Sequence, residues 1–279
     1  MTGSLPPLGQ GGWNIGDDPS RADEEIAALR LGLELGLTLI DTAEMYGEGR
    51  SEMLIGRAVK GMPRETFQIV SKVYPHNAGR GQLRQSCEHS LRRLGLDELD
   101  LYLLHWRGSV PLEETAEGME TLVRAGKIRA WGVSNFDTAD MEELRCVSGG
   151  DRCAANQVLY HLGSRGIEYD LLPWLEAHGV AAMAYCPLAQ GGRLARMGQD
   201  LRADPALLRV AERYGATVPQ ILLAFVLRRP NVTAIPKAGR EAHVRDNARA
   251  RELDIAPEDW AELDAVFWPP ACKMHLDIE

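Results

Sequence analysis

The sequence predicts an α/β fold, a (β/α)8 TIM barrel that forms a single domain over residues 1–279. Strand-like and helix-like segments alternate along the chain, which is typical of a parallel sheet with helical crossovers. The strand-like segments are short and apolar, as parallel strands buried on both faces require. No Pro/Ser-rich linker or run of like charges divides the chain. A doubly wound sheet is the alternative. If such a sheet held a dinucleotide, a G-x-G-x-x-G motif would be expected after its first strand, and the sequence has no such motif.

Eight segments have the composition of buried strands. Seven of them are richer in Val, Ile, Leu and Tyr, and the opening segment LPPLGQGGW is the eighth. In chain order, the expected strands are 5–13, 38–41, 67–73, 99–105, 128–134, 154–158, 180–186 and 231–237.

The segments between these strands carry helix signals. The first helix is expected to start at Ser20, which forms a capping box with Asp23, and to end at Gly36. Ile26, Leu29 and Leu33 fall on one face of it. Further helices are expected over 53–60, 82–94, 112–124, 138–145 and 169–178, with two more helical stretches between a long loop at 187–194 and position 229.

Composition limits the class of protein. The formal net charge is -9, and no dense Lys/Arg cluster suggests nucleic-acid binding. The five cysteines form no C-x-x-C pair, and the first residues lack the pattern of a signal peptide. The run ILLAFVL is far too short to span a membrane. We therefore expect a cytoplasmic protein that is a monomer and binds neither nucleic acid nor membrane.

Polar side chains stand where the predicted strands end, and in a barrel the active site lies at the C-terminal ends of the strands. Polar groups there are common to all barrels. An acid, a phenol, an amine and an imidazole on three neighbouring strands are more specific. The residues at these ends are Gly12, Trp13, Asp41, Tyr46, Lys72, Tyr74, His105, Trp106, Ser134, Asn135, Asn156, Gln157, Tyr185 and Lys237.

Together, Asp41, Tyr46, Lys72 and His105 have the chemistry of a proton donor to a carbonyl oxygen. A phenol is a weak acid near neutral pH, and a neighbouring ammonium lowers its pKa. Asp41 would hold Lys72, and a neutral His105 would orient the carbonyl as negative charge develops on its oxygen. Taken singly, Lys72 is better explained as a rim lysine paired with Asp41, and His105 as a core histidine bonded to the backbone.

Seven segments, in this order, resemble the aldo-keto reductase family, and the compact chain resembles its bacterial members. They are DTAEMYGEGRSE, IVSKV, LDLYLLHW, WGVSNF, NQVLYH, AYCPLAQGG and AIPKA. The resemblance implies a barrel that binds a nicotinamide cofactor without a Rossmann motif and reduces aldehydes or ketones. It assigns catalysis to Asp41, Tyr46, Lys72 and His105, with Tyr46 as the proton donor.

The same resemblance implies a cofactor site. Ser134, Asn135 and Gln157 match residues that hold the nicotinamide amide, and Tyr185 matches the ring that stacks on the nicotinamide. Other cofactor contacts are expected from Gly12, Trp13, Pro187, Leu188, Lys237, Ala238, Arg240, His243, Asp246 and Asn247.

The phosphate-binding segment departs from the family pattern. Ala238 replaces a serine, and His243 stands where the family often has arginine. Lys237 and Arg240 still favour the 2′-phosphate of NADPH, so NADPH is the expected cofactor, with NADH a weaker alternative.

The aromatic residues Trp13, Tyr74 and Trp106 match the walls of the family's substrate pocket, although barrel packing explains them as well. Arg107 replaces a proline that often follows His-Trp in the family. One alternative function is a non-catalytic, nicotinamide-nucleotide-binding regulatory subunit of the same fold. Another is a metal-dependent barrel hydrolase, but the sequence contains no His-x-His, and we expect no metal site.

Overall fold

The computed structural model describes residues 5–194 and 199–279. Its main sheet has eight parallel strands whose spatial order follows the sequence. Residues 1–4 and 195–198, which the predicted domain includes, lie outside the described residues. The strands of this sheet are β1 (Gln10–Gly11), β2 (Leu39–Asp41), β3 (Gln68–Val73), β4 (Leu99–Leu104), β5 (Ile128–Ser134), β6 (Ala155–Leu159), β7 (Ala181–Tyr185) and β10 (Val232–Ala234).

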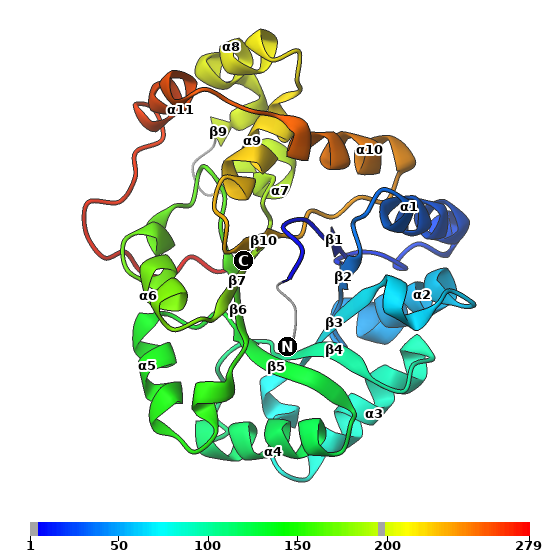
Figure 1. The fold of residues 1–279 in the computed structure, drawn as a ribbon. Coiled ribbons are helices and arrows are strands. Elements are labelled where there is room, and N and C mark those ends of the chain that lie inside the picture. Colours follow the sequence, from blue (N-terminus) through cyan, green and yellow to red (C-terminus); the bar gives the residue numbers. More distant parts are fainter. Residues whose placement is uncertain (1–4, 195–198) are drawn as a thin grey trace.

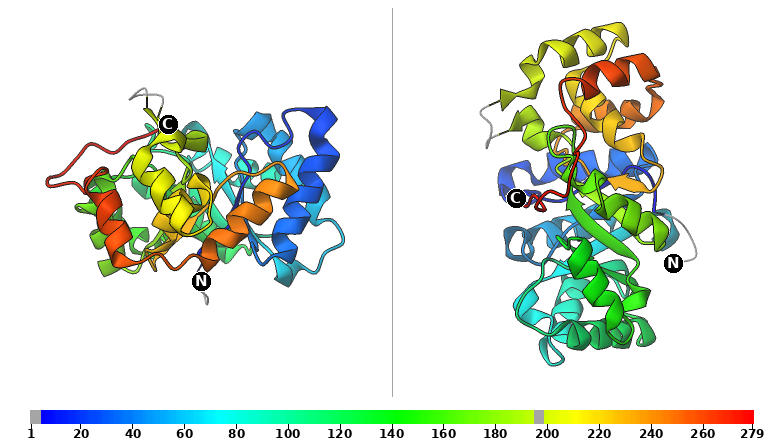
Figure 2. Two further views of the ribbon diagram at one scale, coloured as in Figure 1. Left: turned by 90° about the horizontal axis from the view of Figure 1, so that it is seen from above. Right: turned by 90° about the vertical axis from the view of Figure 1, so that its left-hand side faces the viewer.

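Helices surround the curled sheet (Figure 1), and the view from above in Figure 2 shows them outside the strands. A short antiparallel pair, β8 (Arg193–Leu194) and β9 (Gln199–Asp200), stands apart from the main sheet. The helices are α1 (Ala22–Glu34), α2 (Arg50–Val59), α3 (Gln82–Leu94), α4 (Leu112–Arg124), α5 (Thr138–Cys146), α6 (Leu171–Ala177), α7 (Ala189–Gly192), α8 (Pro205–Arg213), α9 (Val218–Leu227), α10 (Glu241–Arg249) and α11 (Pro257–Asp264).

Two apolar clusters account for the arrangement. A small cluster inside the curl includes Leu39, Val70, Leu101 and Met183, and a larger one fills the layer between strands and helices. Because side chains on a strand point alternately to opposite faces, each strand from β2 to β7 contributes to both clusters.

The two ends of the sheet approach one another. The backbone N–H of Gly9 donates to the carbonyl of Ala234 at 2.8 Å, and that of Gly11 donates to the carbonyl of Pro236 at 3.0 Å. Parallel bridges also join Leu8 to Ala234 and Gly11 to Lys237. The eight parallel strands thus form a curled sheet with helices outside it.

Most predicted elements are present, with differences at the ends of the chain. The capping box at Ser20 is wrong: α1 starts at Ala22, after a short 3-10 helix whose first turn is capped by Asp18. Proline at position 19 favours that tight turn. Helices α10 and α11 were not predicted, because their apolar residues are few and one face of each is exposed.

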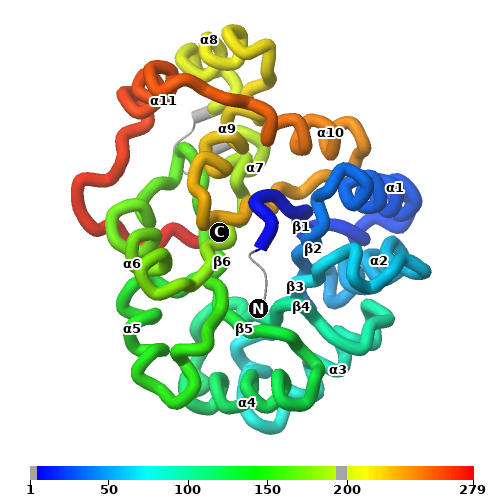
Figure 3. The backbone as a smooth tube through the Cα atoms, viewed as in Figure 1, coloured from blue at the N-terminus to red at the C-terminus, as the bar shows by residue number. Residues whose placement is uncertain are grey.

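The chain after α11 returns across the molecule, as the tube in Figure 3 shows. Lys273 pairs with Asp170 at 3.2 Å, and Ser164 donates to Asp277 at 2.6 Å. Glu279 reaches Tyr185, whose phenol oxygen accepts its backbone N–H at 3.3 Å. No described helix is long and apolar enough to cross a membrane.

Candidate active site

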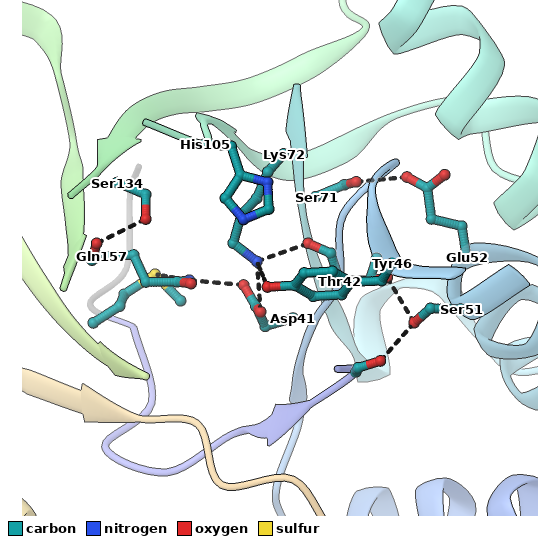
Figure 4. Close-up of polar contacts among 12 residues, drawn as sticks. Asp41, Thr42, Tyr46, Ser51, Glu52, Ser71, Lys72, His105, Ser134 and Gln157 are labelled. Atoms are coloured by element: carbon teal, nitrogen blue, oxygen red, sulfur yellow. Dashed lines mark hydrogen bonds and ion pairs between the residues drawn. The ribbon is translucent and has the colours of Figure 1, made fainter. Parts of the chain in front are cut away.

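Three side chains from neighbouring elements meet at the carboxyl ends of the strands (Figure 4). The ammonium of Lys72, at the end of β3, donates to Asp41 at 2.7 Å and to the phenol oxygen of Tyr46 at 3.0 Å. It also donates to the carbonyl of Thr42 at 2.9 Å. Asp41 and Lys72 are both buried, so the ammonium is held in one position with its donors satisfied.

The position of Tyr46 depends on the turn that follows it. Tyr46 opens the 3-10 segment Tyr46–Gly49, in which Gly47 has φ 56° and Gly49 has φ 88°. Glycine adopts such left-handed conformations without the steric cost of a side chain. The turn brings the phenol back over Lys72, and this explains why two glycines follow an aromatic residue in the motif.

A hydrogen-bonded chain through Thr42, Ser51 and Gly12 lies beside Asp41, Tyr46 and Lys72. The hydroxyl of Thr42 donates to Ser51 at 2.9 Å, and Ser51 donates to the carbonyl of Gly12 at 2.9 Å (Figure 4). Gly12 lies so close to β2 that a Cβ there would come within 2.6 Å of the Asp41 carbonyl oxygen. A larger residue at position 12 would therefore displace the strand that carries Asp41.

His105 follows β4 and faces the same group. Its ring meets the ring of Tyr46 edge to face, with centroids 5.7 Å apart. Burial, with the Lys72 ammonium adding to its effect, lowers the pKa of His105 to about 2. The imidazole is therefore neutral at physiological pH. Its Nδ1 atom is buried and has no hydrogen-bond partner among the described residues.

One sequence expectation about the phenol is wrong. Burial raises the pKa of Tyr46 well above its usual range, and the Asp41 carboxylate raises it further. This outweighs the lowering by Lys72 that the sequence suggested. Burial also lowers the pKa of Lys72 and raises that of Asp41, while each partner opposes the shift of the other. The phenol keeps its proton, as a donor must.

A second hydrogen-bonded chain extends from Asp41 across β6 to β7. The side-chain amide of Gln157 donates to Asp41 at 2.7 Å, and the hydroxyl of Ser134 donates to the main-chain carbonyl of Gln157 at 2.8 Å. Asn135 donates to Ser134 at 3.3 Å and accepts from the Tyr185 hydroxyl at 2.9 Å. Asn135 has φ 60°, so its backbone bends at the end of β5 and directs the amide toward Tyr185.

The predicted phosphate-binding residues lie farther round the rim, at the end of β10 and on α10. Lys237 is exposed and has no ion pair or side-chain hydrogen bond among the described residues. Arg240 lies 3.6 Å from Glu24, and His243 is exposed on α10. The remaining members are Ala238, which packs against the outer core, Asp246, whose carbonyl accepts from Gln220, and the buried Asn247.

Aromatic rings stand around Tyr46. Trp13 is 50% exposed and meets the Tyr46 ring edge to face at 4.9 Å, and Trp106 is 36% exposed. Tyr74 meets Trp106 at 6.0 Å. Arg107 points away to α5, where its guanidinium donates to Asp140 and Glu143, each at 2.7 Å. Pro187 is buried and Leu188 packs against the outer core, both just after β7.

Comparisons with known proteins decide the family. The profile of the Aldo/keto reductase family matches residues 7–267. The chain belongs to the aldo/keto reductase family. It is 52% identical to the methylglyoxal reductase YeaE of Escherichia coli, over 99% of this chain and 95% of that protein. It is 32% identical to a glyoxal reductase of Bacillus subtilis, over 94% and 89% of the two chains.

A solved aldo/keto reductase from Klebsiella pneumoniae, in complex with NADP and acetate, has the same fold. It superposes with a TM-score of 0.96 at 51% identity, covering 99% of this chain and 96% of that one. Membership of the aldo/keto reductase family confirms the predicted class, an NADP(H)-dependent oxidoreductase that reduces carbonyl compounds.

The residues present fit a nicotinamide cofactor. An extended dinucleotide needs amide partners and an aromatic face at one end and a cation at the other. Asn135, Gln157 and Tyr185 are placed together at the first end, and Lys237 leaves its ammonium unpaired among the described residues at the second. The described residues contain no group of three His, Cys, Asp or Glu side chains that could hold a metal ion.

The sequence did not identify Arg21 or Glu24 as neighbours of the predicted phosphate-binding residues. Arg21 lies beside Gly239, and Glu24 lies between Arg21 and Arg240. The contacts of Arg21 with Gly239 and of Glu24 with Arg240 join distant parts of the chain, with 218 positions separating Arg21 from Gly239. No motif in this aldo/keto reductase marks Arg21, because its local sequence is that of a helix start.

Proposed function

We propose that this aldo/keto reductase uses NADPH to reduce small aldehydes and ketones, with α-dicarbonyls such as methylglyoxal as preferred substrates, and that Tyr46 is the proton donor. One observation carries the proposal: Lys72 contacts both Asp41 and the Tyr46 phenol beside a neutral His105. This is the geometry that a carbonyl oxygen requires when it becomes negative and takes up a proton.

The substrate oxygen would lie between the Tyr46 hydroxyl and His105. The phenol donates a hydrogen bond to that oxygen, and the imidazole, if its facing nitrogen carries the proton, donates a second. As charge develops on oxygen, the proton passes from Tyr46, and the Lys72 ammonium stabilises the phenolate that remains. Bound NADPH supplies the hydride to carbon. Asp41 keeps Lys72 charged and aimed at the phenol.

Two groups of residues would hold the cofactor. Ser134, Asn135 and Gln157 would bind the nicotinamide carboxamide, and the Tyr185 ring would lie against one face and so fix which hydride is delivered. The other proposed contacts are Gly12, Trp13, Pro187, Leu188, Lys237, Ala238, Arg240, His243, Asp246 and Asn247.

Support for α-dicarbonyl substrates comes from the relatives. A protein 52% identical to this chain is named a methylglyoxal reductase, and another at 32% is named a glyoxal reductase. Trp13, Tyr74 and Trp106 would form the walls around the reacting carbonyl. Arg107 is engaged by α5, so it would offer no counter-charge to an anionic substrate.

We also propose that the bridges between the first and last strands close the sheet into a (β/α)8 barrel. A closed barrel of this length would be a single domain. We propose separately that the protein is a monomer and that it is cytoplasmic. The backbone bonds from Gly9 and Gly11 support closure, and analytical ultracentrifugation tests the oligomeric state.

The experiment is a steady-state assay of NADPH oxidation with methylglyoxal, glyoxal, benzaldehyde and acetone, repeated with NADH. We expect the highest kcat/KM with methylglyoxal and NADPH. Turnover of benzaldehyde but not methylglyoxal would overturn the substrate class. Tight NADPH binding without turnover of any carbonyl would instead favour the non-catalytic subunit.

A further inference from the structure

Arg21 lies near the start of the chain, yet it reaches the rim of the proposed phosphate site, which is formed by residues near the end of the chain. It ends the 3-10 helix before α1, and α1 packs beside α10 (Figure 1). Its guanidinium Nη2 lies 3.4 Å from the carbonyl oxygen of Gly239. A Cβ built on Gly239 would lie 3.3 Å from Arg21 Nη2 and 3.4 Å from Lys237 Nζ. The cations of Arg21 and Lys237 therefore both lie beside Gly239.

A side chain at position 239 would crowd both cations, because its Cβ would lie within 3.4 Å of each. Glu25 is also close, with Oε1 3.4 Å from the same Cβ position. The other carboxylate oxygen of Glu25 accepts the backbone N–H of Gly16 at 2.8 Å, and the residue is buried. Glu25 thus anchors the loop before α1 and places one negative charge beside Lys237 and Arg21.

Glu24 holds the two arginines of this corner. It lies 3.1 Å from Arg21 and 3.6 Å from Arg240, and all three side chains are at least partly exposed. The corner therefore has three cations, Arg21, Lys237 and Arg240, and two carboxylates. Partial burial lowers the pKa of Lys237, with Arg21 adding to the lowering and Glu25 opposing it. An incoming dianion would stabilise this excess of positive charge.

We propose that Arg21 binds the 2′-phosphate of NADPH and determines the preference for NADPH over NADH. A guanidinium offers a planar pair of donors that matches a phosphate, which the ammonium of Lys237 does not. Glu24 and the carbonyl of Gly239 hold Arg21 in place beside Lys237, so little side-chain freedom is lost on binding. The inference rests on the proposed placement of the adenosine end at Lys237.

The test measures dissociation constants, so it does not depend on turnover. Wild type, Arg21→Gln, Arg21→Lys and Lys237→Gln are titrated with NADPH, NADH, 2′,5′-ADP and 5′-ADP by calorimetry. Arg84→Gln is the matched control, because it removes an exposed guanidinium from α3 that pairs only within its own helix among the described residues. Thermal melts show whether each variant is folded.

We expect Arg21→Gln to weaken NADPH and 2′,5′-ADP by about 10- to 100-fold, with NADH and 5′-ADP changed less than about twofold. Arg21→Lys should fall between wild type and Arg21→Gln, and Arg84→Gln should match wild type.

Equal weakening of NADPH and NADH in Arg21→Gln would overturn the inference, because the residue would then be structural. Unchanged NADPH affinity in Arg21→Gln, with a selective loss in Lys237→Gln, would overturn the role of Arg21 alone. No selective loss in either variant would overturn both the inference and the placement of the phosphate. NADPH-dependent turnover of methylglyoxal tests the proposed reaction separately from all these outcomes.

Discussion

Lys72 and Lys237 both stand at strand ends on the rim of the sheet, yet their surroundings are opposite. Lys72 is 0% exposed and donates to Asp41, to Tyr46 and to the Thr42 carbonyl. Lys237 is exposed and has no ion pair with any described residue. The charge of Lys72 is balanced by a buried partner, whereas that of Lys237 is not paired with any described residue.

The difference corresponds to two tasks. A group that stabilises charge during a reaction works best when it is fixed beforehand in a site with little water, and Lys72 meets that condition. A group that captures a phosphate must remain reachable, and its charge must not already be neutralised. Substitutions at the two lysines should therefore separate turnover and stability from cofactor selectivity.

The largest effect should come from removing the acidic proton beside Lys72. In Tyr46→Phe the ring is retained, so folding and NADPH affinity should change little. Loss of a general acid typically costs 10²–10⁴-fold, and we expect kcat to fall by roughly that factor. Stopped-flow measurement of a single turnover checks this, with Tyr74→Phe as the control. Near-normal turnover in Tyr46→Phe would show that another group donates the proton.

The next effect tests whether Lys72 balances charge within the protein. Lys72→Met leaves the Asp41 carboxylate buried beside an apolar side chain, and breaking a buried pair costs roughly 3–5 kcal/mol. We expect a loss of that size in the free energy of unfolding by urea, together with a large drop in kcat. The matched variant Lys237→Met should unfold like wild type. Similar stability losses in the two variants would remove the distinction between the lysines.

The third effect concerns selectivity. Lys237→Met should weaken NADPH by about 10- to 100-fold and leave NADH nearly unchanged, because a charged hydrogen bond to the 2′-phosphate is lost. Tryptophan fluorescence quenching gives both dissociation constants. A parallel loss for both cofactors would make Lys237 a contact to the part of the dinucleotide that they share.

Sequence reasoning predicted which side chains meet around Tyr46 better than it predicted the surroundings of Lys237, for physical reasons. Asp41, Lys72 and His105 end apolar strands, and the order of strands in a parallel sheet brings neighbouring strand ends together. The pKa of Tyr46 was misjudged because burial depends on packing that no motif encodes. The contact of Arg21 with Gly239 depends on how α1 packs beside α10, which local sequence does not reveal.

The boundaries of the strands also show which features local sequence predicts and which depend on tertiary contacts. Strand β5 matches its predicted range, since Ile128 to Ser134 is buried except at Arg129, and residues with positive φ, Gly126 and Asn135, lie near its two ends. Strand β1 contains only Gln10 and Gly11, because prolines and glycines around it limit regular pairing. The remaining bonds at that edge come from isolated bridges, whose register is set by tertiary contact.

The smallest effect is a pH dependence of stability that belongs to the buried catalytic end. Burial lowers the pKa of His105 to about 2, whereas in the unfolded chain it is near 6.5. The unfolded state therefore binds the proton first as the pH falls below about 6.5, and stability declines from there toward pH 2. For one such histidine the decline is about 1.4 kcal/mol per pH unit. His161, whose pKa burial lowers to about 4, adds a similar slope above that pH.

The experiment measures the free energy of unfolding by urea between pH 6 and pH 4.5. We expect it to fall less steeply with falling pH in His105→Asn than in wild type. The exposed His243→Asn serves as the control and should keep the wild-type slope. An unchanged slope in His105→Asn would mean that this imidazole accepts a proton in the folded protein, and it would then be charged beside Lys72 at acidic pH.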